Sequence, residues 1–184
     1  RFPDGLWAAA DCFVSLIDNI QESFGLTPIE AMACGLPVIA SDWDGYRDGV
    51  RHKQDGFLIP TTLPPADHGL LLAERYYNQL DGYGEYLCAS SQSTSIDIDA
   101  AASAMAELAE NPHLRKTMGA SGKRRAEDTY DWRHIIRAYE NLWHELAEQR
   151  RAEKTITVQS APWQAAHPSC PNPWEMFAPF PTTH

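Results

Sequence analysis

Short apolar segments alternate with polar loops in the first third of the chain. Residues 12–16 and 36–41 are apolar runs between polar residues, which is typical of strands buried on both faces of a parallel sheet. Between them, residues 27–34 carry helix signals and end at a glycine. This order predicts a strand–helix–strand unit over residues 12–41 with a right-handed crossover. Residues 57–60 predict a further brief strand, ended by proline.

Three short helices are expected later in the chain. The first ends near Glu110 and is capped by Asp97 or Asp99. The second covers residues 113–118 and ends at a glycine. The third covers residues 121–129, whose run of Lys and Arg indicates a solvated helix face.

The clearest helix of the chain covers residues 131–150 and begins at Asp131 as its cap. Its apolar positions follow the spacing of a single helix face, and we expect that face to lie in the core. These positions are Trp132, Ile135, Ile136, Tyr139, Leu142, Trp143 and Leu146. Regular patterns stop after residue 151, and the proline-rich residues 160–184 predict an extended tail that lies on a surface.

Charge and cysteine spacing exclude several classes of partner. The formal net charge is −10 and the sequence pI is about 5.0, so nucleic-acid binding through a basic surface is not expected. The four cysteines lie too far apart for a metal knuckle or a redox pair, which suits a reducing cytoplasm. No apolar run is long enough to span a bilayer. The chain opens without an initiator Met, so we expect a fragment whose membrane contact, if any, is peripheral and made through missing parts.

Two loops follow the first two expected strands, at residues 18–26 and 42–49. Ligands of open parallel sheets bind beyond the carboxyl ends of the strands, where these loops meet. Gly25 lets a backbone N–H approach a ligand, and a helix beginning at Thr27 points its free N–H groups and positive dipole end at the same place. The sequence therefore predicts a site suited to a diphosphate.

Two carboxylates flank this predicted site. Glu30 is placed to accept hydrogen bonds from a ribose diol, and Glu22 is placed to do the same for a sugar ring. An alternative for Glu30 is a capping box with Thr27, in which it satisfies helix donors and binds nothing. The alternative for Glu22 is an ordinary solvated loop carboxylate.

Acidic residues in the second loop offer a different interpretation. Asp42, Asp44 and Asp48 are potential metal ligands, but their spacing is common in loops, and no metal is expected. Arg47 is placed either to contact phosphate or to form a surface ion pair with Asp44 or Asp48.

Glu22 and Glu30, with seven residues between them, precede Ala-Met-Ala-Cys-Gly-Leu-Pro-Val-Ile-Ala-Ser. This pattern resembles the signature of the retaining family 4 glycosyltransferases, and residues 41–48 and 55–60 are similar to the segments that follow it there. The resemblance implies an α/β fold. In this fold, the chain would supply the Rossmann-like parallel sheet of the second domain of a GT-B fold, which binds the nucleotide sugar. That domain is expected to be incomplete here and to be followed by C-terminal helices and an irregular tail. Asp48 stands where many relatives have Glu, and Asp44 where many have Gly.

The resemblance also implies roles for single residues. Glu22 would be the catalytic residue that contacts the donor sugar, and Glu30 would bind the ribose. The other donor-binding residues implied are Ser23, Phe24, Gly25, Leu26 and Thr27. The family is described as metal-independent, so no cofactor is implied besides the UDP-, GDP- or ADP-linked sugar substrate.

The implied activity is hexosyl transfer to an unknown acceptor with retention of configuration. The acceptor-binding N-terminal domain is missing, so this fragment is not expected to transfer sugar alone. Two alternatives stay open: a nucleotide-sugar isomerase of GT-B fold, and a non-catalytic binding or interaction module. The expected organisation is the carboxyl part of the donor-binding domain at 1–60, an insertion at 61–96, the helical C-terminal part of the domain at 97–151, and the tail at 152–184.

Overall fold

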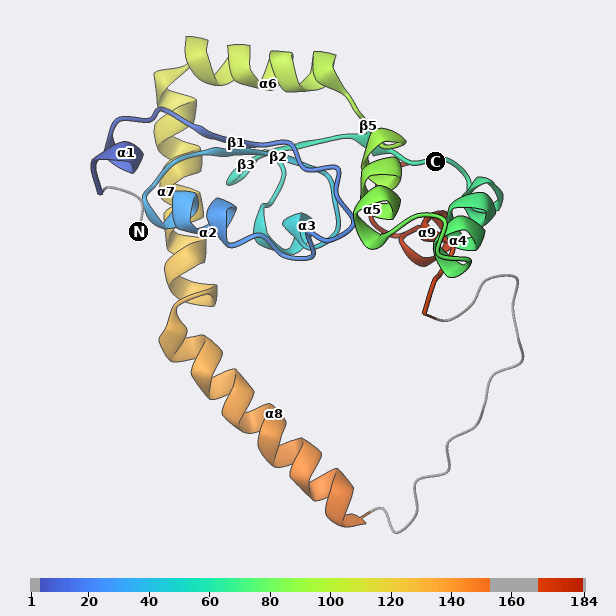
Figure 1. Ribbon diagram of the computed structural model, residues 1–184. Coiled ribbons are helices and arrows are strands. Elements are labelled where there is room, and N and C mark those ends of the chain that lie inside the picture. The colour runs from blue at the N-terminus through green and yellow to red at the C-terminus, as the bar shows by residue number, and fades with distance from the viewer. Residues whose placement is uncertain (1–3, 153–168, 184) are drawn as a thin grey trace.

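A computed structural model describes residues 4–152 and 169–183, and its centre is a small parallel sheet (Figure 1). The strands lie in the order β1-β2-β3, and each neighbouring pair is parallel. The bounds of this part are α1 (Asp4–Ala8), β1 (Phe13–Ser15), α2 (Leu26–Ala33), β2 (Val38–Ser41), α3 (Tyr46–Gly49) and β3 (Gly56–Ile59). The predicted α/β class, the parallel sheet and the strand–helix–strand unit are confirmed.

The first strand is less buried than its sequence predicts. β2 is the central strand and all four of its residues are buried, whereas the three residues of β1 are only half-buried. β1 lies at the edge of the sheet, where the ring of Trp7 packs on Phe13 at 5.7 Å between centroids. The prediction of a strand buried on both faces is therefore wrong for β1, because an apolar run does not reveal how many neighbours a strand has.

The helix between these strands begins earlier than predicted. α2 starts at Leu26, with Gly25 as its N-cap at φ 69° and no side-chain capping bond, so Thr27 is not the cap. A Cβ on Gly25 would lie only 2.1 Å from the ring of Tyr46, so a residue with a side chain does not fit there. Glycine thus meets two demands, a left-handed backbone and a close approach, and the chain turns into the helix directly after it. Pro28 is tolerated because amides of the first turn lack intrahelical partners.

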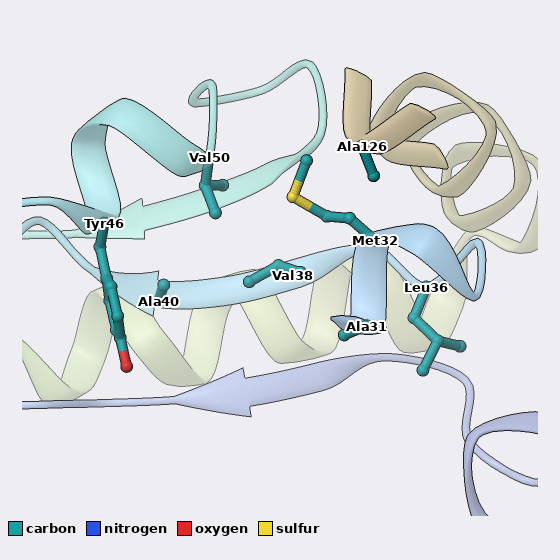
Figure 2. Packing of buried hydrophobic residues seen from close by; sticks show 8 residues of the cluster. All are labelled: Ala31, Met32, Leu36, Val38, Ala40, Tyr46, Val50 and Ala126. Atoms are coloured by element: carbon teal, nitrogen blue, oxygen red, sulfur yellow. The ribbon is translucent and has the colours of Figure 1, made fainter. Parts of the chain in front are cut away.

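The main core lies between α2, β2 and the long helix α7 (Pro112–Thr129). Figure 2 shows the Met32 side chain of α2 between Ala126 of α7 and Val50, while Tyr46 points past β2 toward the edge strand. A second cluster joins the sheet to α6 (Ile98–Glu110) through residues such as Leu108 and Ile39.

Residues 112–129 form one helix rather than the two predicted. Gly119 does not end a helix; it lies in the middle of α7, where a Cβ would be 2.0 Å from the carbonyl oxygen of Gly35. The glycine serves close packing against the chain after α2. Of the two caps considered for α6, Asp97 is the one used, because its side chain accepts a hydrogen bond from the Ala100 amide.

The aromatic helix contradicts its prediction most clearly. α8 (Trp132–Ala152) forms as expected but contains no buried residue. Trp132 is 70% exposed and Trp143 62% exposed. In Figure 1, α8 extends away from the sheet. The expectation that its apolar face belongs to the core is wrong within the described residues.

The remaining elements pack together beside the sheet (Figure 1). They are β4 (Thr61–Thr62), a 3₁₀ turn η1 (Ala66–Gly69), α4 (Leu70–Tyr77), α5 (Tyr83–Gln92), β5 (Ser95–Ile96) and α9 (Pro173–Met176). Two short helices, α4 and α5, occupy most of the segment expected as an insertion, and α5 continues through the serines to Gln92. The buried hydroxyl of Ser90 is satisfied by the Leu87 carbonyl, which lets serine continue the helix.

The described part of the C-terminal tail, residues 169–183, packs into the fold and contains a short helix, so these residues are not an extended surface segment. Its Trp174 is 3% exposed and packs in a cluster with Trp43, Leu63 and Tyr86. The other tail tryptophan, Trp163, lies outside the described residues. None of the helices in the described ranges combines the length and the hydrophobicity needed to cross a membrane.

Candidate functional site

The loop after β1 is shaped by its own backbone. The Glu22 amide donates to the carbonyl of Asn19 at 3.0 Å, and the Gln21 amide donates to the Asn19 side chain at 2.9 Å. This turn leaves the Glu22 side chain half-buried. Within the part of the chain that the structure describes, its carboxylate makes no hydrogen bond or ion pair. It is therefore available to a ligand.

The loops after β1 and β2 are in direct contact, as the sequence predicts. A Cβ at Gly45 would lie 1.9 Å from the carbonyl oxygen of Ser23, so only glycine fits there. Next to it, Tyr46 fills the space beside Gly25, and its hydroxyl is 3.0 Å from the Ser15 hydroxyl at the end of β1. The two loops are thus locked at the carboxyl edge of the sheet, where ligands of such sheets bind.

Tyr46 is a residue of this site that sequence reasoning did not single out. Burial raises the pKa of its hydroxyl, and the negative charge of Glu22 raises it further, although the hydrogen bond from Ser15 acts in the opposite direction. In the sequence, Tyr46 stands out only as an aromatic residue directly after a glycine in a loop between strands, and that pattern is too common to identify a site.

The N-terminus of α2 opens beside these residues. In the described ranges, the backbone amides of Phe24, Gly25 and Leu26 donate no hydrogen bond, and no side chain caps the helix. Leu26 is 63% exposed. Free amides and the positive end of a helix dipole favour an anion at this point.

Glu30 lies on the exposed side of α2. The capping box that was its alternative is not formed, because Thr27 is inside the helix and no side chain caps it. Like that of Glu22, the side-chain carboxylate of Glu30 has no hydrogen-bond or ion-pair partner in the described ranges, whereas its backbone carbonyl accepts from the Cys34 amide. Ser23 is exposed and Thr27 half-buried. The structure thus brings Ser23, Phe24, Gly25, Leu26 and Thr27 together between the two carboxylates.

The C-terminal end of α7 contacts both loops of the site. The ring of Phe24 meets the ring of Tyr130 edge-on at 5.8 Å, and the Tyr130 hydroxyl donates to the Asp48 carbonyl at 2.7 Å. Arg125 donates to the carbonyls of Gly49 and Asp48 at 2.9 and 2.6 Å. Arg125 is half-buried, so the solvated basic face expected over residues 121–129 is wrong at this position.

The acidic loop after β2 is used for internal contacts. Arg47 forms an ion pair with Asp42, not with Asp44 or Asp48, and it also donates to the carbonyls of Asp42 and Pro179. Burial is the main cause that raises the pKa of Asp44. In the ranges that the structure describes, no three His, Cys, Asp or Glu side chains gather as a metal site requires.

Comparison with known proteins finds relatives of the first part of the chain. Residues 3–68 match the family model described as glycosyl transferases group 1. D-inositol 3-phosphate glycosyltransferase from Jonesia denitrificans is 52% identical over 51 residues, which is 28% of this chain and 12% of that protein. Phosphatidyl-myo-inositol mannosyltransferase from Mycobacterium leprae is 51% identical over 39 residues, 21% of this chain and 10% of that protein. The chain thus matches only a small part of these relatives' length.

A solved structure extends the similarity beyond the first three strands. Sucrose-phosphate synthase from Thermosynechococcus elongatus superposes with a TM-score of 0.52 and 26% identity, over 78% of this chain and 27% of that one. This similarity confirms the α/β fold of GT-B type expected from the signature. Together with the sequence matches, it shows that residues 3–68 are similar to the glycosyl transferases group 1.

Proposed function

We propose that this chain binds the nucleotide-sugar donor of a retaining family 4 hexosyltransferase. The observation that carries the proposal is the set of unpaired groups around the start of α2. Two carboxylates without partners in the described chain, Glu22 and Glu30, flank the open amides of residues 24–26. Carboxylates accept hydrogen bonds from sugar hydroxyls, and helix amides stabilise phosphate oxygens.

Each group has a distinct role in this proposal. The amides of residues 24–26 bind the diphosphate and stabilise the negative charge that grows on it as the sugar leaves. Glu30 accepts hydrogen bonds from the ribose hydroxyls. Glu22 binds hydroxyls of the donor sugar and holds the reacting carbon in place. The acceptor oxygen bonds to that carbon on the face from which the phosphate leaves, and the leaving phosphate takes the acceptor proton, so that configuration is retained. Catalysis then depends on positioning and charge stabilisation.

The acceptor is proposed to bind on a second, N-terminal domain of the whole enzyme. The matched relatives are named for inositol phosphate and phosphatidyl-inositol acceptors, which makes a polyol phosphate a reasonable first acceptor to test.

The test uses the full-length enzyme with Glu22→Gln and Glu30→Gln and a panel of radiolabelled UDP-, GDP- and ADP-sugars. Glu30→Gln is expected to weaken binding of the matching nucleoside diphosphate about tenfold, because a charge-assisted hydrogen bond becomes a neutral one. Glu22→Gln is expected to leave nucleotide binding nearly unchanged and to reduce transfer at least tenfold.

The matched control is Glu110→Gln at the exposed end of α6, which is expected to change neither quantity. Unchanged nucleotide affinity in Glu30→Gln would contradict the ribose assignment. Isomerised donor without transfer, or binding without either reaction, would replace the proposal with one of the two alternatives.

A further inference from the structure

The C-terminal segment, residues 171–183, packs against the loop after β2, although it lies at the far end of the chain. Its last residues join the small sheet beside the core: the amides of Thr182 and Thr183 donate to the Thr61 carbonyl at 3.0 and 2.9 Å. Thr183 forms a parallel bridge with Thr62, and the Leu63 amide donates to the Thr183 carbonyl at 3.0 Å. The segment is therefore held by backbone bonds typical of a strand.

From this position the segment contacts the acidic loop, residues 42–47. The Thr182 hydroxyl donates to the Asp42 carboxylate at 2.7 Å, and the same carboxylate pairs with Arg47. Arg47 donates in turn to the Pro179 carbonyl at 2.6 Å, and the ring of Phe180 meets Trp43 edge-on at 5.6 Å. These contacts form one connected network across the loop.

One contact supports a strained part of the backbone. Asp44 has a φ of 32°, a conformation that residues other than glycine adopt rarely. Its amide donates to the Phe180 carbonyl at 3.1 Å. A residue in this conformation persists when surrounding contacts fix it. The C-terminal segment supplies such a contact.

The opposite side of the same loop faces the proposed donor site. Gly45 lies against the backbone of Ser23, and Tyr46 lies against Gly25. The Trp43 indole donates to the Asn19 carbonyl at 3.3 Å. Any shift of residues 42–46 must therefore move the turn that carries Glu22 and the start of α2.

We infer that residues 171–183 act as a clamp that fixes the acidic loop, and that Thr182 is a positioning residue for nucleotide-sugar binding. The second half of this statement rests on the proposed function. The clamp acts through the Thr182–Asp42–Arg47 network and the Phe180 carbonyl. It holds Gly45 and Tyr46 against the loop that presents the free amides.

Thr182→Val in the full-length protein tests the clamp, because valine keeps the shape of threonine and removes the hydroxyl that donates to Asp42 and accepts from the Thr61 amide. Thr183→Val is the matched control: its hydroxyl contacts Thr62 and the Thr61 carbonyl and does not touch the acidic loop. Two quantities are measured: amide hydrogen exchange over residues 42–48 without ligand, and binding of UDP, GDP and ADP.

The expected result is about tenfold faster exchange of the loop amides in Thr182→Val, with nucleoside-diphosphate binding weaker by several fold and both unchanged in Thr183→Val. Unchanged loop exchange in Thr182→Val overturns the clamp. Faster exchange with unaltered nucleotide affinity overturns the positioning role. If the unmodified protein binds no nucleoside diphosphate, the proposed function fails, while hydrogen exchange still decides the clamp.

Discussion

Two consecutive helices, α7 and α8, show opposite relations between sequence pattern and burial. α7 has a weak apolar pattern and many Lys and Arg residues, yet Met118, Gly119, Gly122 and Ala126 are buried in it. α8 has the strongest apolar face of the chain, and none of its residues is buried. The helix whose Lys and Arg run predicts a solvated face has a second face that is packed, and the helix whose apolar face is predicted to lie in the core is exposed.

The difference shows what a hydrophobic pattern measures. Periodicity reports that a helix has an apolar face, but not which surface covers that face. α7 achieves burial through small residues that allow close approach to α2, and small residues contribute little to an apolar pattern. It is also tied to the sheet by polar contacts: Ser121 donates to the buried carboxylate of Asp55 at 2.9 Å.

The packing of α7 is tested most strongly by Gly119→Ala. Its Cβ would lie 2.0 Å from the Gly35 carbonyl oxygen, so the two backbones must move apart. We expect the free energy of unfolding to fall by about 3 kcal/mol, although alanine is the better helix former by about 1 kcal/mol. Urea denaturation followed by circular dichroism measures the change.

The control for this substitution is Gly84→Ala in α5, where a Cβ meets nothing within 4 Å. It is expected to raise stability by about 0.5 kcal/mol. If Gly119→Ala behaved like Gly84→Ala, the close approach of α7 to the chain after α2 would be wrong.

The polar attachment of α7 predicts a pH dependence. Burial raises the pKa of Asp55, but hydrogen bonds from Arg51 and Ser121 and the charge of Arg51 outweigh it, so the net shift is downward. A pKa lowered by folding stabilises the protein above the unfolded value of about 3.9, and this stabilisation is lost as pH falls through the folded value. The free energy of unfolding should therefore decline below about pH 4.

Asp55→Asn is expected to lower stability by about 2 kcal/mol at pH 7 and to flatten the decline at acid pH. Asp131→Asn is the matched control. Asp131 also has a lowered pKa, mainly from its bond with Arg133, but that pair is local to the start of α8 and Arg133 is 82% exposed. If Asp131→Asn reduced the loss of stability at acid pH as much as Asp55→Asn does, the bond between Ser121 and Asp55 would not be the cause of that loss.

The strand–helix–strand unit is predictable from sequence because its signals are local. Apolar runs, two prolines and two glycines within thirty residues indicate the order of the elements. The merging of two predicted helices at Gly119 is not predictable in the same way. Glycine ends a helix or permits close contact according to a neighbour that is distant in sequence, here Gly35.

The candidate site is predictable only in part for a similar reason. Glu22, Glu30 and Gly25 are recognisable by their spacing, and the roles assigned to them stay predictions. The contribution of Tyr46, and the arrival of Thr182 and Phe180 from the C-terminal segment, depend on tertiary packing. No local pattern links Thr182 to Asp42, because 140 positions separate them in the chain.

The smallest expected effect concerns α8, the exposed helix of the two that are compared. Trp143 lies on the apolar face of α8 and is 62% exposed. Trp143→Gln removes a large aromatic side chain but little buried surface, so we expect the free energy of unfolding of this 184-residue chain to change by less than about 0.5 kcal/mol. Within the described residues its ring contacts that of Tyr139, 5.9 Å away on the same helix, and that contact is local.

Denaturation of Trp143→Gln beside the unmodified chain measures the difference. A loss above about 2 kcal/mol would mean that the face is covered in solution, and the contrast between α7 and α8 would then disappear.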